Sequence, residues 1–196
     1  MTEIAGARRK KLIIATVGLC GVGKSAASHF LAERLETERV YFGGLVTAEI
    51  RRRGVDATPE TEKTVREELR ERYGMDAVAK LAVDPIDKVL EHQPSVVIDG
   101  LYSFAEYTFL RDTFGPSLVS IALHVAKELR YARLAARQKR PLSQDQVDQR
   151  DWDEVRYLDK APPIALADYH VVNDSSVDAL HEALDTVLRS LGRTPR

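Results

Sequence analysis

The sequence predicts a single α/β domain in which a parallel β-sheet is covered by helices on both faces. Short apolar runs, typical of buried strands, alternate with longer helical segments along the 196 residues. A phosphate-binding motif follows directly on the first apolar run, in a strand–loop–helix setting typical of α/β folds. The chain, with 44% hydrophobic and 30% charged residues, is long enough to bury one large core.

Five apolar runs predict the strands of this sheet. They are Leu12 to Val17, Val40 to Phe42, Val96 to Ile98, Leu118 to Leu123 and Tyr169 to Val172. Gly43-Gly44 marks the end of the second run. Residues 1–10 precede the first strand and predict a flexible tail.

Helices are predicted between the strands. A long helical region extends from Leu45 to about Glu91, with breaks near Gly54, Gly74 and Pro85. Thr58-Pro59-Glu60 has the cap, proline and acid typical of a helix start. Further helix starts are predicted at Ser103-x-x-Glu106, Ser143-x-x-Gln146 and Ser175-x-x-Asp178. A basic helix is predicted from Lys127 to about Lys139, and the closing helix ends near Leu191.

The phosphate-binding motif is G-x-x-x-x-G-K-S, from Gly18 to Ser25. Its glycines let backbone N–H groups turn around phosphate oxygens, Lys24 can span the β- and γ-phosphates, and Ser25 can ligate Mg²⁺. A helix beginning at Lys24 would direct its positive dipole end at the same phosphates. The motif therefore predicts a nucleotide site formed by Gly18, Gly21, Val22, Gly23, Lys24, Ser25 and Ala26.

Asp99 follows the third predicted strand, in the pair Asp99-Gly100. In parallel sheets, ligands bind at the carboxyl ends of the strands, where the phosphate loop also lies. Asp99 is therefore a candidate to hold Mg²⁺, directly or through water, or to accept a proton from an acceptor hydroxyl. The alternative is a turn former at a strand end, since Asp-Gly is common in turns.

Four arginines of the basic segment, Arg130, Arg133, Arg137 and Arg140, recur at spacings of three and four and predict one helical face. Guanidinium groups stabilise the charge of a transferring phosphoryl group better than ammonium groups do. We therefore expect a catalytic contact from this face, with Arg133 and Arg137 the favoured residues. The alternative is a solvated face whose charges meet nearby acids.

Composition excludes several other classes of function. The net charge of −1 supplies no basic field, so no nucleic-acid partner is expected. Cys20 is the single cysteine, which excludes an intramolecular disulfide and a cysteine-based zinc cluster and suits the cytoplasm. No apolar stretch is long enough for a membrane span. The five histidines lack the spacing of metal ligands, so none is assigned to a metal. The sequence is compatible with a monomer or a homodimer.

These motifs together resemble nucleoside monophosphate kinases and dephospho-CoA kinases. The resemblance rests on the loop at Gly18, on Asp99-Gly100, on the helical insertion between the second and third strands, and on Arg133-Leu134-x-x-Arg137. The end of the chain, residues 167–174, is similar to the end of dephospho-CoA kinases. Residues 47–54, 74–80 and 164–169 look like an adenylate-kinase-related family of uncharacterised, largely archaeal proteins. The likeness runs nearly end to end.

The resemblance implies a three-layer P-loop kinase fold with a parallel five-stranded sheet in the order 2-3-1-4-5. It implies a single domain with a core at residues 11–43, 93–136 and 161–191, a helical acceptor-binding insertion at 44–92, and a short lid at 137–160. Asn173 would approach the adenine of the nucleotide, although such residues often only form local turns.

The implied activity is an ATP- and Mg²⁺-dependent transfer of the γ-phosphoryl group to a small nucleotide-like acceptor, of the nucleoside monophosphate or the dephospho-CoA type. Lys24, Asp99, Arg133 and Arg137 would be catalytic, and Ser25 and Asp99 would hold the metal. If the acceptor is a hydroxyl, Asp99 or Glu49 must take its proton. GTP as the donor stays open.

The chain also departs from the resembled families. Adenylate kinases carry one acceptor arginine in the segment that matches residues 44–47 here and another where Ser103 stands. Five arginines in neighbouring turns could substitute: Arg51, Arg52, Arg53, Arg66 and Arg70. The alternative is a P-loop ATPase or switch whose helical insertion binds a protein partner. A nucleotide-binding module without catalysis is disfavoured by the intact Lys24, Ser25 and Asp99.

Overall fold

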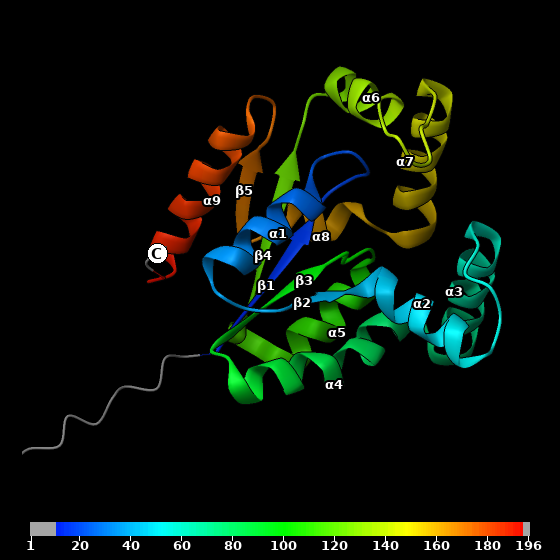
Figure 1. Cartoon of the computed structure of the whole chain (residues 1–196), viewed down its shortest axis with the longest axis horizontal. Helices are drawn as coiled ribbons and strands as arrows, with labels where there is room; N and C mark the ends of the chain where they lie inside the picture. The colour runs from blue at the N-terminus through cyan, green and yellow to red at the C-terminus, as the bar shows by residue number, and fades with distance from the viewer. Residues whose placement is uncertain (1–10, 194–196) are drawn as a thin grey trace, which may run out of the picture.

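A computed structural model of the chain, which describes residues 11–193, has one parallel sheet with helices on both faces (Figure 1). The strands are β1 (Leu12–Val17), β2 (Arg39–Tyr41), β3 (Ser95–Asp99), β4 (Leu118–His124) and β5 (Tyr169–Val172). Their order is β2-β3-β1-β4-β5, and all paired neighbours are parallel. The predicted fold class and sheet order are therefore confirmed. The predicted tail at residues 1–10 lies outside the described residues.

The central strand β1 organises two cores. All six of its residues are buried, and it pairs with β3 on one side and β4 on the other. Since successive side chains of a strand point to opposite faces, Ile13, Ala15 and Val17 enter one core. Leu12 and Ile14 enter the second core on the opposite face. The continuous apolar run of β1 is thus the pattern expected of a strand covered on both faces.

Helices cover both faces of the sheet. Figure 1 shows α1 (Lys24–Arg34) and α9 (Val177–Ser190) on one side, and α4 (Ala77–His92) and α5 (Phe104–Phe114) on the other. The remaining helices are α2 (Phe42–Arg52), α3 (Pro59–Tyr73), α6 (Lys127–Ala135), α7 (Gln144–Leu158), α8 (Ala161–Ala165) and the short 3₁₀ helix η1 (Gly115–Ser117). No helix within residues 11–193 has the length and apolar character needed to cross a bilayer.

The predicted insertion contains three helices, α2, α3 and α4. Thr58 caps α3 and forms a capping box with Thr61, as the Thr58-Pro59-Glu60 pattern indicates. The predicted break near Pro85 is wrong, because α4 continues through it. Pro85 removes the hydrogen bond to the carbonyl of Leu81, and Leu81 lies on the solvent side, 41% exposed, where water can take that place.

Several predicted boundaries shift in the structure. The second strand ends at Tyr41, because Phe42 already begins α2. The basic helix ends at Ala135 and not near Lys139. Beyond it the chain turns back, so that the Leu142 N–H donates to the Leu134 carbonyl. The cap of the closing helix is Ser176, one residue after the predicted Ser175.

Ser103 caps α5, and its hydroxyl accepts from the Glu106 N–H at 3.1 Å. We predict that Ser103→Ala lowers the free energy of unfolding by about 1–2 kcal/mol, because a buried N–H loses its partner. Thr113→Ala is the control, since the exposed Thr113 hydroxyl bonds only to its own helix. Thermal unfolding measures both variants, and equal effects of the two would contradict the role of the cap.

Candidate nucleotide-binding site

Gly21 and Gly23, in the loop between β1 and α1, are at positions that a larger residue does not fit. Gly21 and Gly23 have φ angles of 88° and 97°, in the left-handed region that favours glycine. A Cβ at Gly23 would lie 2.4 Å from Nδ2 of Asn173, and one at Gly21 would lie 2.9 Å from Cγ of Leu134. The motif glycines therefore permit both the turn and its close contacts with Asn173, just after β5, and with Leu134 of α6.

Side chains hold the carbonyl groups of this loop. Four of these carbonyls accept hydrogen bonds: Gly18 and Leu19 from Lys24 Nζ at 2.8 and 2.9 Å, Cys20 from Arg130 Nε at 3.0 Å, and Val22 from Asn173 Nδ2 at 2.9 Å. These contacts fix the shape of the loop from within the protein. The contacts from Arg130 and Asn173 can persist when phosphate binds and keep the loop preorganised, whereas Lys24 must exchange its carbonyl partners for phosphate oxygens.

A cavity of about 590 Å³ opens beside the loop. Cys20, Gly21, Gly23, Lys24, Ser25 and Ala26 form one wall of it, whereas Gly18 and Val22 do not reach it. Its cationic lining consists of Lys24, Arg66, Arg133, Arg137, Arg140 and Arg150, and its acidic lining of Glu62, Asp99 and Glu154. Cations outnumber acids, so the cavity favours an anionic ligand.

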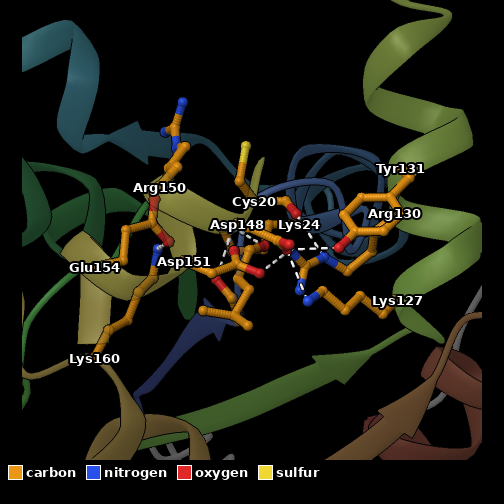
Figure 2. A network of polar contacts seen from close by, with 12 residues as sticks. Cys20, Lys24, Lys127, Arg130, Tyr131, Asp148, Arg150, Asp151, Glu154 and Lys160 are labelled. Carbon is orange, nitrogen blue, oxygen red and sulfur yellow. Dashed lines mark hydrogen bonds and ion pairs between the residues drawn. The ribbon is translucent and has the colours of Figure 1, made fainter. Parts of the chain in front are cut away.

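Lys24 lies at the centre of this cavity's charge network (Figure 2). Burial, and to a smaller extent the positive charge of Lys160, lower the pKa of Lys24 to about 7. Lys160 is itself buried and pairs with Glu154 at 2.6 Å, while Arg150 donates to the same carboxylate at 3.0 Å. The site therefore holds several cations at close range, which a polyphosphate would stabilise.

Asp99 lines the cavity from the end of β3 and pairs with Arg39 of the neighbouring strand. The distance from Arg39 Nη1 to Asp99 Oδ2 is 3.0 Å, and the Asp99 side chain is 5% exposed. The hydroxyl of Ser25 and the carboxylate of Asp99 are hard oxygen donors on one cavity, which fits Mg²⁺. Residues 11–193 contain no cluster of three or more potential metal-ligating side chains. Mg²⁺ sites commonly use one or two carboxylates completed by phosphates and water.

The predicted arginine face divides into two parts. Arg133, Arg137 and Arg140 line the cavity, although only Arg133 belongs to α6. Arg133 Nη1 donates to the Asn173 carbonyl at 2.9 Å, and Arg137 Nη1 lies 3.8 Å from the Cys20 sulfur. The single helical face that the spacing indicates is wrong, because α6 ends at Ala135. The chain that turns back nevertheless carries Arg137 and Arg140 to the cavity.

Arg130 is buried and connects the phosphate loop to the predicted lid (Figure 2). Besides its bond to Cys20, it pairs with Asp151 of α7 at 2.5 Å. A second contact between the same helices joins Asp148 to Lys127 at 2.7 Å. Arg130 therefore has a structural role, and it does not line the cavity.

Two further predicted residues are located away from the cavity. Asn173 is buried and uses its amide to hold the Val22 carbonyl, so its predicted approach to adenine stays a prediction. Glu49, one of the two candidate bases, pairs with Arg52 and Arg53 on α2 and does not line the cavity. Of the two candidate bases, the structure brings only Asp99 to the phosphate loop.

Sequence reasoning missed several residues of the site. Tyr41 ends β2 and Tyr102 follows β3, so the rule that ligands bind at the carboxyl ends of strands could have indicated both. Arg150 and Glu154 read as an ordinary surface pair at a spacing of four on a helix. Nothing in the sequence pattern distinguishes this pair from a solvated one.

The fold and the loop together define a P-loop protein with a kinase-type fold. A family model described as an AAA domain matches residues 14–153, well over half of the chain. A UPF0200 protein of Thermococcus sibiricus is 33% identical over 184 residues, which cover 92% of this chain and 96% of the relative. The chain therefore belongs to the UPF0200 proteins and to the AAA-domain family that the model describes. The predicted relationship to a largely archaeal family is confirmed.

Solved structures with a similar fold include kinases. A shikimate kinase from Bacteroides thetaiotaomicron has a TM-score of 0.60 at 15% identity, covering 92% of this chain and 98% of that chain. A gluconokinase from Sinorhizobium meliloti has a TM-score of 0.55 at 14% identity, covering 95% and 98%. At such low identity the likeness establishes the fold alone, and it confirms the predicted P-loop kinase type.

The low pKa of Lys24 predicts that ADP binding at pH 8 takes up close to one proton, because the phosphates restore the charged form. The sign follows from a pKa of about 7, which leaves Lys24 mostly neutral at pH 8. Calorimetry in two buffers of different ionisation enthalpy measures the uptake. Lys24→Arg is the control, because a guanidinium stays protonated and takes up no proton. Equal uptake by both proteins would contradict the prediction.

Proposed function

We propose that the protein is an ATP- and Mg²⁺-dependent kinase that transfers the γ-phosphoryl group to a small nucleotide-like acceptor. The observation that carries the proposal is the cavity of about 590 Å³ on which Lys24, Asp99 and the arginines of the lid segment converge. Phosphoryl transfer requires positioning and charge stabilisation more than covalent chemistry, and this cavity offers both.

The donor would bind at the phosphate loop. Lys24 would leave the carbonyls of Gly18 and Leu19 and contact the β- and γ-phosphates, and α1 would direct its positive end at them. Ser25 would hold Mg²⁺ directly, and Asp99 would hold it directly or, where Asp99 takes a proton, through water; Mg²⁺ supplies charge neutralisation of the phosphate oxygens when bound. The pairing of Asp99 with Arg39 keeps one carboxylate oxygen fixed in orientation.

The transfer itself balances without a further reactant. The bond from the γ-phosphorus to the bridging oxygen breaks, and its electron pair stays with ADP. A new bond forms from that phosphorus to an acceptor oxygen. If this oxygen belongs to a phosphate, no proton needs to leave; if it belongs to a hydroxyl, the proton goes to Asp99. Arg133 and Arg137 would stabilise the charge on the transferring group.

One observation favours the alternative, a P-loop ATPase or switch whose insertion binds a protein. Ser103, which stands where adenylate kinases carry an acceptor arginine, is buried and serves as a helix cap. If no other group replaces that arginine, a phosphorylated acceptor has no binding site in the insertion. The two functions differ in whether a small acceptor raises ATP turnover.

An acceptor screen by coupled ADP release tests the proposal, with nucleoside monophosphates and dephospho-CoA as acceptors. We expect at least one acceptor to raise ADP release about tenfold or more above the rate without acceptor. Lys24→Ala is the control and abolishes turnover while the fold is retained, because the cation that contacts both phosphates is removed. The same ADP release with and without every acceptor would favour the ATPase or switch.

The two favoured arginines, Arg133 of α6 and Arg137 of the predicted lid, give a second test. We predict that Arg133→Lys and Arg137→Lys each lower kcat on the order of tenfold and leave the KM for ATP nearly unchanged, because lysine keeps the charge but loses the guanidinium fork. Arg156→Lys is a matched control, since Arg156 is on α7, stacks on Tyr157 and does not line the cavity. Full turnover in both variants would show that these arginines have no role in phosphoryl transfer.

A further inference from the structure

Two half-buried arginines on α3 lack hydrogen-bond partners within residues 11–193. They are Arg66 and Arg70, one helical turn apart. The Nε of Arg70 is buried without a hydrogen-bond partner, and no hydrogen bond or ion pair reaches the guanidinium of Arg66 among these residues. A buried donor without a partner destabilises the folded chain. Such a group is commonly retained for a ligand and not for stability.

These arginines face a small cavity beside the nucleotide cavity. It measures about 100 Å³ and is lined by Arg66, Arg70, Tyr102, Arg150, Glu154 and Leu158. That volume corresponds to about three water molecules, comparable with one phosphate or carboxylate group. Four of its residues, Arg66, Tyr102, Arg150 and Glu154, also line the nucleotide cavity, so the two spaces adjoin.

The charges around this small cavity favour an anion. Glu154 is already neutralised, because it accepts from Lys160 at 2.6 Å and from Arg150 at 3.0 Å. Glu106, buried behind Arg70 at the edge of the site, accepts from the N–H groups of Tyr102 and Ser103. Burial raises the pKa of Glu106 to about 7, which reduces its negative charge near neutral pH. Positive charge therefore remains in excess.

We propose that Arg66, Arg70 and Arg150 form an anion subsite that binds a phosphate or carboxylate group of the acceptor. This inference rests on the proposed kinase function and assigns the class of acceptor: a molecule with an anionic group separate from the oxygen that is phosphorylated. Arginine suits this task because its fork can bind two oxygens of one anion. The subsite would replace the acceptor arginine that is absent at Ser103.

The subsite lies where the predicted insertion meets the predicted lid. Arg66 and Arg70 belong to the predicted insertion, and Arg150 belongs to the predicted lid. The two segments approach each other at one end of the molecule (Figure 1), where Arg140 pairs with Glu62 at 3.3 Å. A groove lined by Met75, Tyr157 and Leu158, among others, continues outward between α3 and α7. It gives room for the body of an acceptor larger than its anionic group.

Anion titration of the full-length protein tests the subsite without any need for turnover. The protein is saturated with ADP and Mg²⁺, and inorganic phosphate and acetate are titrated separately by calorimetry. We expect phosphate or acetate to bind, and Arg66→Gln and Arg70→Gln each to weaken that binding about tenfold or more. The tighter of the two probes identifies the anion class. Arg72→Gln, exposed on the same helix, is the matched control and leaves binding unchanged.

A purely structural role of Arg70 predicts a different result. If Arg70 only balances the charge of Glu106, Arg70→Gln lowers the melting temperature and leaves anion affinity as in the wild type. The subsite predicts a melting temperature without added anion that is equal or higher in the variant. Arg66→Gln gives the same affinity test should Arg70→Gln fold poorly. Anion affinity unchanged in both variants, or no anion binding to the wild type, would overturn the subsite.

Kinetics separate failure of the subsite from failure of the kinase function. With an acceptor found in the screen, Arg66→Gln and Arg70→Gln raise the KM for the acceptor about tenfold or more and leave the KM for ATP unchanged. If neither substitution changes turnover or the KM for the acceptor, the subsite is rejected and the proposed kinase function is retained. Anion binding that depends on both arginines, without turnover of any acceptor, supports the subsite and rejects the kinase. ADP serves to keep the probe anion away from the phosphate loop. If ADP does not bind, the anion titration is repeated on Lys24→Ala, in which the loop has lost its cation.

Discussion

The rest of the site depends on the hydrogen bonds that side chains donate to the carbonyl groups of the phosphate loop. Lys24 of α1, Arg130 of α6 and Asn173, which follows β5, donate hydrogen bonds to four of its carbonyls. Each contact also connects the loop to another part of the molecule. Asn173 connects it to the end of β5, and Arg130 connects it to α7 through Asp151. The loop is thereby preorganised, and the predicted lid is anchored to it.

The cationic surroundings of the loop follow from the same arrangement. Once α6 and α7 are anchored, Arg133 and Arg150 lie on a cavity that already contains Lys24. Desolvation and mutual repulsion of these cations are unfavourable, as the lowered pKa of Lys24 indicates. Glu154 compensates part of the charge through Lys160 and Arg150. The remaining positive charge is what a polyphosphate donor and an anionic acceptor would neutralise, so stability and function favour different charge balances here.

Local signals predicted the α/β fold class and the phosphate loop because they depend on neighbours in sequence, whereas the strand order followed from the resemblance to known kinases. The buried run of β1, the glycines before Lys24 and the cap at Ser103 act over a few residues each. The rest of the site depends on contacts between distant segments, such as Arg39 with Asp99 or Asn173 with Val22. The spacing of Arg133 and Arg137 predicted correctly that both residues line the cavity, but it predicted one continuous helix. The helix ends at Ala135, and the turn after it brings Arg137 to the cavity.

The fate of the γ-phosphorus tests the central claim most directly. ³¹P nuclear magnetic resonance can follow ATP and Mg²⁺ with the full-length protein and a mixture of anionic acceptors. The account predicts that a phosphorylated acceptor signal grows in step with ADP, and that inorganic phosphate stays a minor product. Formation of inorganic phosphate alone, at one rate with and without acceptors, would contradict it and indicate an ATPase or switch.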